Sequence, residues 1–150
     1  MEQKAASFEP ILENLLRQYL VFKDEYDQLA YLQAFYSSCI IKIFPGKEDY
    51  RKSFFFPFGI LHKNILKGRL ELMKHTLSHL QGLEKDFILL RYFELQSRDF
   101  VMQYLRISSI STYKRLRRRS LRIFLHYFVH DKDFDIYFWD YQFLKKMLVS

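Results

Sequence analysis

The feature that most restricts the fold is the scarcity of the two residues that mark turns. The chain of 150 residues contains only four glycines and three prolines, while 49% of it is hydrophobic. β-sandwiches and barrels need a turn roughly every 8–12 residues, and Gly and Pro signal most of these turns. A chain with few turn signals and many apolar residues is expected to form long helices that bury a shared core. We therefore predict an all-α fold.

Apolar residues spaced three and four positions apart predict where the helices lie. The expected helices span residues 8–22, 24–44, 60–80, 83–95, 98–105, 110–127 and 134–148. Ser97, Ser108 or Ser109, and Asp133 stand where helices need N-caps. Gln81-Gly82 is the strongest break between helices. We expect a helical module over residues 1–80, a helix-turn-helix module over 81–130 and a C-terminal aromatic tail over 131–150.

The residue types present exclude most catalytic and metal chemistry. Cys39 is the only cysteine, so the chain can form neither an intramolecular disulfide nor a Cys-x-x-Cys metal site. His75/His79 and His126/His130 have the i, i+4 spacing of metal ligands, but no Glu or Cys in the pattern completes either site. The sequence has no Gly-rich phosphate loop and no Ser-His-Asp set. We expect no enzyme activity, no cofactor and no metal.

The sequence predicts a cytoplasmic protein without a membrane anchor. Residues 1–7 are polar and lack the apolar core of a signal peptide. No run approaches the ~18 consecutive apolar residues that a membrane span requires.

One segment carries the whole net charge of +7. Between Phe100 and His130 the chain has no acidic residue. The rest of the chain is neutral, because it contains 17 of the 24 Lys and Arg and all 17 Asp and Glu. Such concentration of one sign of charge is typical of a surface that binds a polyanion. The seven basic residues are Arg106, Lys114, Arg115, Arg117, Arg118, Arg119 and Arg122.

The helix expected after residue 109 separates into an apolar and a basic face on a helical wheel. Arg117 falls within the apolar arc and would have to extend its guanidinium to solvent. The apolar face contains Ile110, Tyr113, Leu116, Ser120, Leu121, Ile123 and Phe124. The other face contains Ser111, Lys114, Arg115, Arg118, Arg119 and Arg122, with Thr112 at its border.

A short helix, a four-residue turn and this longer basic helix predict a helix-turn-helix. Arg106 occupies the turn position where glycine is common, so a left-handed backbone there would be strained. The recognition helix of such a motif lies in the major groove, with its N-terminal residues at the base edges and later cations beside phosphates. The predicted DNA-binding residues are Ser109, Ser111, Thr112, Lys114, Arg115, Arg118, Arg119 and Arg122.

Residues 80–125 resemble region 4 of sigma-70-type RNA polymerase sigma factors. The shared pattern is a helix ending in Leu90-Arg91-Tyr92-Phe93, a second ending at Leu105, Ile107-Ser108 in the turn and Arg115-Leu116 on the recognition helix. The module is also similar to that of ArpU-like phage late-gene regulators, through Ser111-Thr112-Tyr113 followed by Ser120-Leu121. Both resemblances imply that Ser109, Ser111, Thr112, Arg115 and Arg118 contact promoter DNA.

Two upstream segments are similar to sigma region 2. Phe8-Glu9-Pro10-Ile11-Leu12 resembles the opening of that region, and Lys63-Asn64-Ile65-Leu66 resembles the core of its promoter-binding helix. The resemblance implies a transcription factor that binds double-stranded promoter DNA and contacts the RNA polymerase core. Two other functions remain open: an interaction module whose basic helix docks on an acidic protein, and a peripheral membrane binder.

Two aromatic segments each allow two interpretations. The Phe54–Phe58 stretch has two interpretations. It either binds another molecule, as a wedge between unstacked bases or an anchor on a partner, or belongs to the hydrophobic core at the start of a helix. The tail places Asp131, Asp133, Asp135 and Asp140 among aromatic residues. Aromatic residues at this density are rarely left in water, so the tail is expected to dock, either on the chain's own core or on a second copy or polymerase.

Overall fold

The protein is all-α, as predicted from the sequence. The computed structural model describes residues 7–43 and 57–149, with the side chains of 7–34 and 61–148, and no β-strand occurs within these ranges. The Phe54–Phe58 stretch lies outside the described side chains. The elements are α1 (Glu9–Arg17), α2 (Tyr19–Ile43), α4 (Pro57–Ser78), α5 (Gly82–Ile88), the π-helical turn η2 (Leu89–Phe93), α6 (Arg98–Tyr104), α7 (Ile110–Val129), α8 (Phe134–Tyr137), the 3₁₀ turn η3 (Trp139–Tyr141) and α9 (Phe143–Val149).

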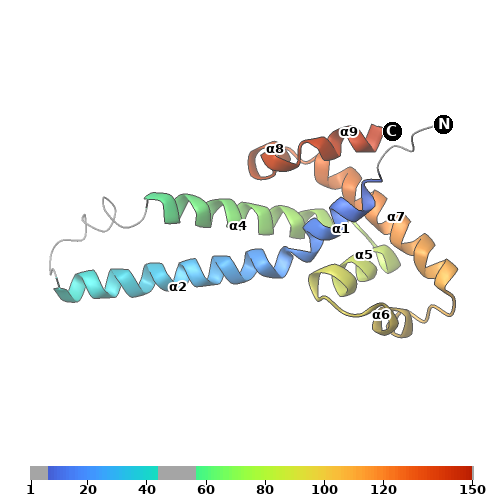
Figure 1. Cartoon of the computed structure of the whole chain (residues 1–150), viewed down its shortest axis with the longest axis horizontal. Helices are drawn as coiled ribbons and strands as arrows, with labels where there is room; N and C mark the ends of the chain where they lie inside the picture. The colour runs from blue at the N-terminus through green and yellow to red at the C-terminus, as the bar shows by residue number, and fades with distance from the viewer. Residues whose placement is uncertain (1–6, 44–56, 150) are drawn as a thin grey trace.

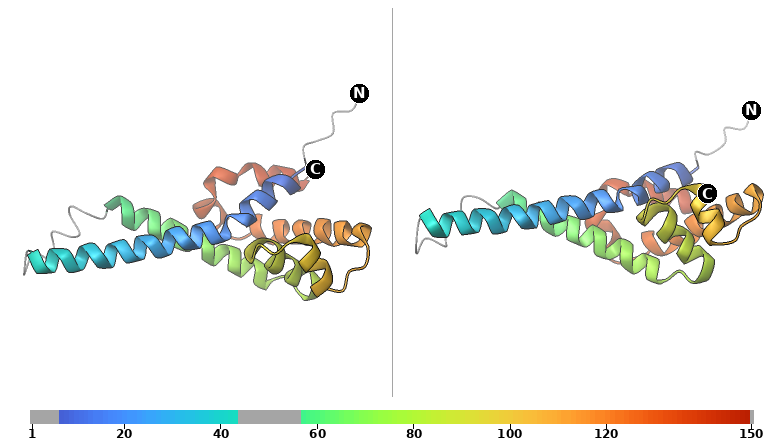
Figure 2. Two further views of the ribbon diagram at one scale, coloured as in Figure 1. Left: turned by 60° about the horizontal axis from the view of Figure 1, so that its bottom comes forward. Right: turned by 90° about the horizontal axis from the view of Figure 1, so that it is seen from below.

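The molecule consists of a helical body and a projecting two-helix arm (Figure 1). Helices α2 and α4 run antiparallel and extend away from the body in all views (Figure 2). Between them, the Lys63 ammonium donates a hydrogen bond of 2.9 Å to the side-chain carbonyl of Gln33. The body contains α1 and the elements from α5 to α9.

The first helix ends earlier than the sequence pattern predicted. We expected one helix over residues 8–22, but α1 ends at Arg17 and α2 begins at Tyr19. The break follows from packing, because α1 contacts α7 and η2 whereas most of α2 packs along α4. One straight helix cannot follow both directions, and the chain bends at Gln18.

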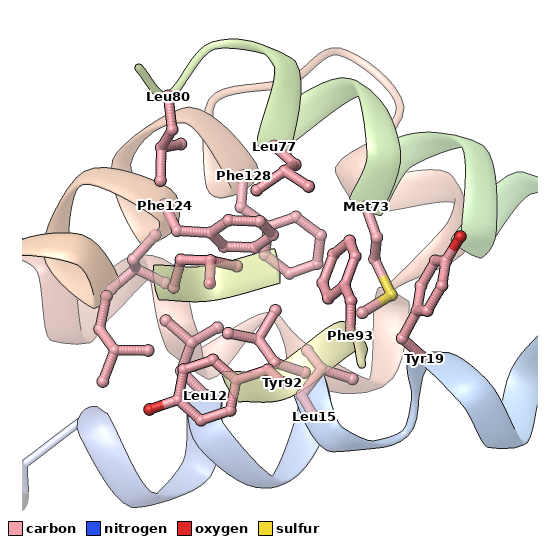
Figure 3. Close-up of a cluster of buried hydrophobic side chains, with 14 of the residues drawn as sticks. Leu12, Leu15, Tyr19, Met73, Leu77, Leu80, Tyr92, Phe93, Phe124 and Phe128 are labelled. Atoms are coloured by element: carbon pink, nitrogen blue, oxygen red, sulfur yellow. The ribbon is translucent and has the colours of Figure 1, made fainter. Parts of the chain in front are cut away.

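One buried cluster draws on all three predicted segments, and Figure 3 shows residues that α1, α2, α4, η2 and α7 contribute to it. Leu12 and Leu15 of α1 lie in the same cluster as Phe124 of α7 and Phe138 of the tail. Gly82 takes the left-handed backbone expected of a break, with φ of 59°. The segments on either side of Gln81-Gly82 therefore share one core. The division of the chain into modules at this point stays a prediction.

The tail docks on the chain's own core, which was one of its two predicted modes. Phe134, Phe138 and Leu144 are fully buried. The single helix expected over residues 134–148 was wrong, because α8, η3 and α9 replace it. Phe138 and Leu144 are six positions apart and would lie about 120° apart on one continuous helix; with the helix ending at Phe138, both are buried in the core. Asp133 makes no side-chain capping bond, which also corrects its predicted role.

Arg69 on α4 holds the tail in place. Its guanidinium donates hydrogen bonds of 2.8 Å to the Tyr137 carbonyl and to the Asp140 carboxylate. The guanidinium carbon also lies 5.1 Å from the ring centres of Phe138 and Trp139. Arg69 is mostly buried, and its hydrogen bond satisfies the Tyr137 carbonyl at the point where the tail helix breaks.

We expect Gly68→Ala to destabilise the protein by about 1–3 kcal/mol, because the added methyl group would overpack the α4–tail contact. A Cβ atom at Gly68 would lie 2.0–2.3 Å from ring atoms of Tyr137. The adjacent, exposed Lys67 provides the control, since Lys67→Ala changes the surface of the same helix. Thermal and denaturant unfolding of the two variants measure the difference, and equal stabilities would show that Tyr137 does not pack against Gly68.

Candidate nucleic-acid interface

Helix α6 and the basic helix α7 each begin with a serine cap, and a tight connection joins them. The Ser97 hydroxyl accepts a hydrogen bond of 3.1 Å from the Phe100 N–H at the start of α6, as predicted. The Ser109 hydroxyl accepts one of 3.1 Å from the Thr112 N–H at the start of α7, and so Ser109 rather than Ser108 is the cap. These bonds satisfy amide groups that have no partner within their helices.

Arg106 takes the left-handed conformation, with φ of 57°, at the turn position where the sequence lacks the usual glycine. Its N–H donates to the Gln103 carbonyl at 3.2 Å, and the Ile107 N–H donates to the Met102 carbonyl at 2.8 Å. This pair of bonds is a Schellman motif, which usually places glycine at the left-handed position. The connection between α6 and α7 is thus hydrogen-bonded on both sides, and it sets the direction in which α7 leaves.

The apolar face of α7 is largely as predicted. Tyr113, Leu116, Leu121 and Phe124 are buried in the shared cluster. Ile110 is the exception, because 49% of its surface is exposed. The first turn of α7 lies beyond the helices that bury the rest of its apolar face, and Ser111 and Thr112 are exposed there as well.

Arg117 does not extend to solvent and binds two carboxylates of α1. Its guanidinium lies 2.8 Å from a Glu13 oxygen and 3.3 Å from a Glu9 oxygen. Both glutamates are largely buried, so this double ion pair joins α7 to α1. The sequence-based expectation for Arg117 was therefore wrong, because the wheel could not show which helix would cover that side.

Two further arginines of the predicted site also lie near carboxylates from other helices. Arg119 Nε lies 2.7 Å from a Glu84 oxygen on α5. Arg118 Nε lies 4.0 Å from a Glu9 oxygen, at the limit of an ion pair. These acidic residues come from outside the basic segment, and sequence reasoning missed them. The i, i+4 spacing of Glu9 and Glu13 was a signal that the two share a face, but it did not identify their partner.

The remaining cations form an open stripe along α7. Lys114, Arg115 and Arg122 are exposed, and in the part of the chain that the structure describes they make no hydrogen bond or ion pair. Ser111 lies on the same side and is likewise exposed and unbonded among the described residues. We call Ser111, Lys114, Arg115, Arg118 and Arg122 the open face of α7. Ser111, Arg115, Arg118 and Arg122 recur every three or four positions and so lie along one line of the helix, with Lys114 beside that line.

The hydroxyl groups at the start of α7 are partly committed to each other. Ser109 accepts from the Thr112 N–H and donates to the Thr112 hydroxyl at 2.8 Å. Ser109 therefore acts as a helix cap and has no hydrogen left for a base, whereas Thr112 can still donate its own. Of the three predicted hydroxyl contacts, Ser111 is the one that is fully available.

A partly buried polar arrangement joins α7 to η2 and the loop that follows it. Arg91 of η2 donates to the Tyr113 hydroxyl at 3.2 Å and to the Gln96 carbonyl at 2.9 Å, which joins η2, the following loop and α7. Burial foremost, with the nearby Glu13 carboxylate, raises the pKa of the Tyr92 hydroxyl far above its ordinary value. Tyr92 therefore stays neutral in the core. Residues Leu90-Arg91-Tyr92-Phe93, which carry part of the sequence resemblance, serve packing and orientation in this structure.

The two histidine pairs do not assemble a metal site within the described residues. His75 lies 3.1 Å from Asp131, and the His79 ring stacks on Tyr127 with 4.8 Å between ring centres. No group of three or more His, Cys, Asp or Glu side chains with metal-binding geometry occurs among the residues that the structure covers. Over the same residues, no helix is both long and apolar enough to cross a membrane.

Comparison with known proteins identifies no relative. No protein-family model matches the chain, and no curated protein and no solved structure is significantly similar to it.

Proposed function

We propose that this protein binds double-stranded DNA by placing α7 in the major groove. The observation that carries the proposal is the open face, on which exposed cations follow one side of a 20-residue helix. Among the described residues, Arg118 alone of these cations has a carboxylate within ion-pair distance, at its 4.0 Å limit. The helix is about 30 Å long, and an α-helix fits the width of the major groove. The other sides of α7 are held by α1 and α5, so the open face is presented on a rigid support.

The positions along α7 suggest distinct roles. Ser111 and Arg115 lie near the N-terminus, where a recognition helix approaches base edges, and Arg can bond guanine through two atoms. Arg118 and Arg122 lie further along and would neutralise phosphates. Lys114 stands between these groups and would reach the nearest phosphate.

Salt dependence of binding to a duplex tests this proposal. Lys114, Arg122 and the weakly held Arg118 would neutralise about three phosphates, so log K should fall against log salt with a slope of about −2.7. Fluorescence anisotropy over a range of salt concentrations measures the slope. Anionic vesicles are the control for a membrane surface. A slope near zero, or equal binding to vesicles, would contradict the DNA proposal.

We further propose that the protein acts in transcription as a sigma-70-like factor. The support is the sequence resemblance over residues 80–125, together with the order α5, η2, α6 and α7 along the same stretch. An ArpU-like regulator would bind DNA with the same residues but would not initiate transcription. Run-off transcription with core polymerase and no other sigma factor distinguishes the two, because only a sigma factor should produce a transcript under these conditions.

A further inference from the structure

A hollow at the base of the arm has an apolar floor. It has a volume of about 430 Å³ and lies between the start of α2, the end of α4 and the α5–η2 segment. Tyr19, Leu77 and Phe93 line it, and all three are buried, with no more than 8% of their surface exposed. The Tyr19 and Phe93 rings stack with 4.2 Å between centres and 5° between planes. Because this floor belongs to the shared core, its shape is preformed.

Three lysines surround this floor. Lys23 comes from α2, Lys74 from α4 and Lys85 from α5. None of them makes an ion pair or hydrogen bond with the residues that the structure describes. Glu94 is the one acidic residue that lines the hollow, so the rim has an excess of positive charge. Among the residues that line the hollow, three lysines therefore stand against one carboxylate.

The combination of floor and rim defines the chemistry of the occupant. A large apolar side chain would replace water over the Tyr19–Phe93 stack, and carboxylates beside it would face the lysines. A DNA backbone offers phosphates but no apolar group for the floor, and so it matches only half of the site. A volume of about 430 Å³ is at the lower end of the ~300–1,000 Å³ typical of ligand sites, and it suits one or two side chains.

We infer that this hollow binds an acidic segment of a partner protein through one large apolar side chain flanked by carboxylates. The site uses α2, α4 and α5, whereas the open face lies on α7. The inference is therefore independent of the DNA proposal. Binding of such a segment leaves the open face available, and the protein can hold a protein partner and a duplex together.

Selection from a displayed library of short random peptides tests the inference with the full chain as target. We expect the selected peptides to combine an aromatic or leucine residue with neighbouring Asp or Glu. Lys23→Glu, Lys74→Glu and Lys85→Glu together should weaken their binding by about tenfold or more, because the charge of the rim is reversed. Replacing the apolar residue of a selected peptide by alanine should abolish binding.

The control variant carries Lys67→Glu, Lys132→Glu and Lys146→Glu, which make the same change in net charge at exposed lysines outside the hollow. It should bind the selected peptides as the unchanged protein does. Both variants should keep the fold, since five of the six lysines are exposed and Lys85 is half-buried. The inference is overturned if no selected peptide depends on Lys23, Lys74 and Lys85, if both variants lose binding equally, or if the hollow variant loses duplex affinity instead.

Discussion

Phe138→Ala is expected to lower the free energy of unfolding by about 3–5 kcal/mol, as large-to-small changes of buried aromatic residues do. Phe138 is fully buried, and its ring centre lies 4.8 Å from that of Phe128 on α7. The Arg69 guanidinium, 5.1 Å from the same ring centre, would lose one of its aromatic contacts as well. Chemical denaturation followed by circular dichroism measures the change.

Ile136→Ala is the matched control for this prediction. Ile136 lies two residues before Phe138 and is 62% exposed. Its replacement should change the free energy of unfolding by no more than about 0.5 kcal/mol, as at most surface positions. Similar losses in the two variants would mean that the tail does not pack as the structure has it.

Removal of residues 131–150 should have a still larger effect. The truncation deletes Phe134, Phe138 and Leu144, all with zero exposed surface. Three such losses sum to about 10 kcal/mol, which is comparable to the 5–15 kcal/mol that stabilises a typical domain. We expect the truncated chain to show no cooperative unfolding transition. A truncated protein that melts cooperatively near the temperature of the full chain would contradict the assignment of the tail to the core.

On α7, two substitutions should separate a base contact from an arginine that does not contact DNA. Arg115→Ala should weaken binding to a preferred duplex by about 1–3 kcal/mol and relax the choice of one base pair. Arg119→Ala should have little effect on any duplex, because the Glu84 carboxylate 2.7 Å away already binds that guanidinium. The sequence alone had predicted a phosphate contact for Arg119. Equal effects of the two substitutions on specific binding would refute this division of roles.

Glu84→Gln should make Arg119 available to DNA. The salt slope should then become steeper by about 0.9, the contribution of one further phosphate. Glu71→Gln is the control, because it removes the same charge from an exposed glutamate of α4 whose one ion pair among the described residues is with Lys67. The pair of Glu84 and Arg119 is partly exposed, so the substitution should cost no more than about 1 kcal/mol of stability. Identical slopes for the two variants would show that Glu84 does not restrain Arg119.

Features that depend on neighbouring residues in the chain could be predicted from the sequence. The all-α fold follows from the scarcity of Gly and Pro, and the two faces of α7 follow from helical periodicity. Ser97 caps α6, as its position predicted. Each of these depends on hydrogen bonds or side-chain spacing within about four residues, and a sequence shows such relations directly.

Only the tertiary structure decided which cations of α7 remain open. Arg117 binds Glu13, which lies 104 positions away in the chain, and Arg119 binds Glu84 on another helix. The bend at Gln18 and the break of the tail at Phe138 likewise follow from the surfaces on which α1 and the tail pack. Helical periodicity fixes the direction of a side chain relative to its own helix axis, but the charge or apolar surface that it meets depends on which helices pack against that side.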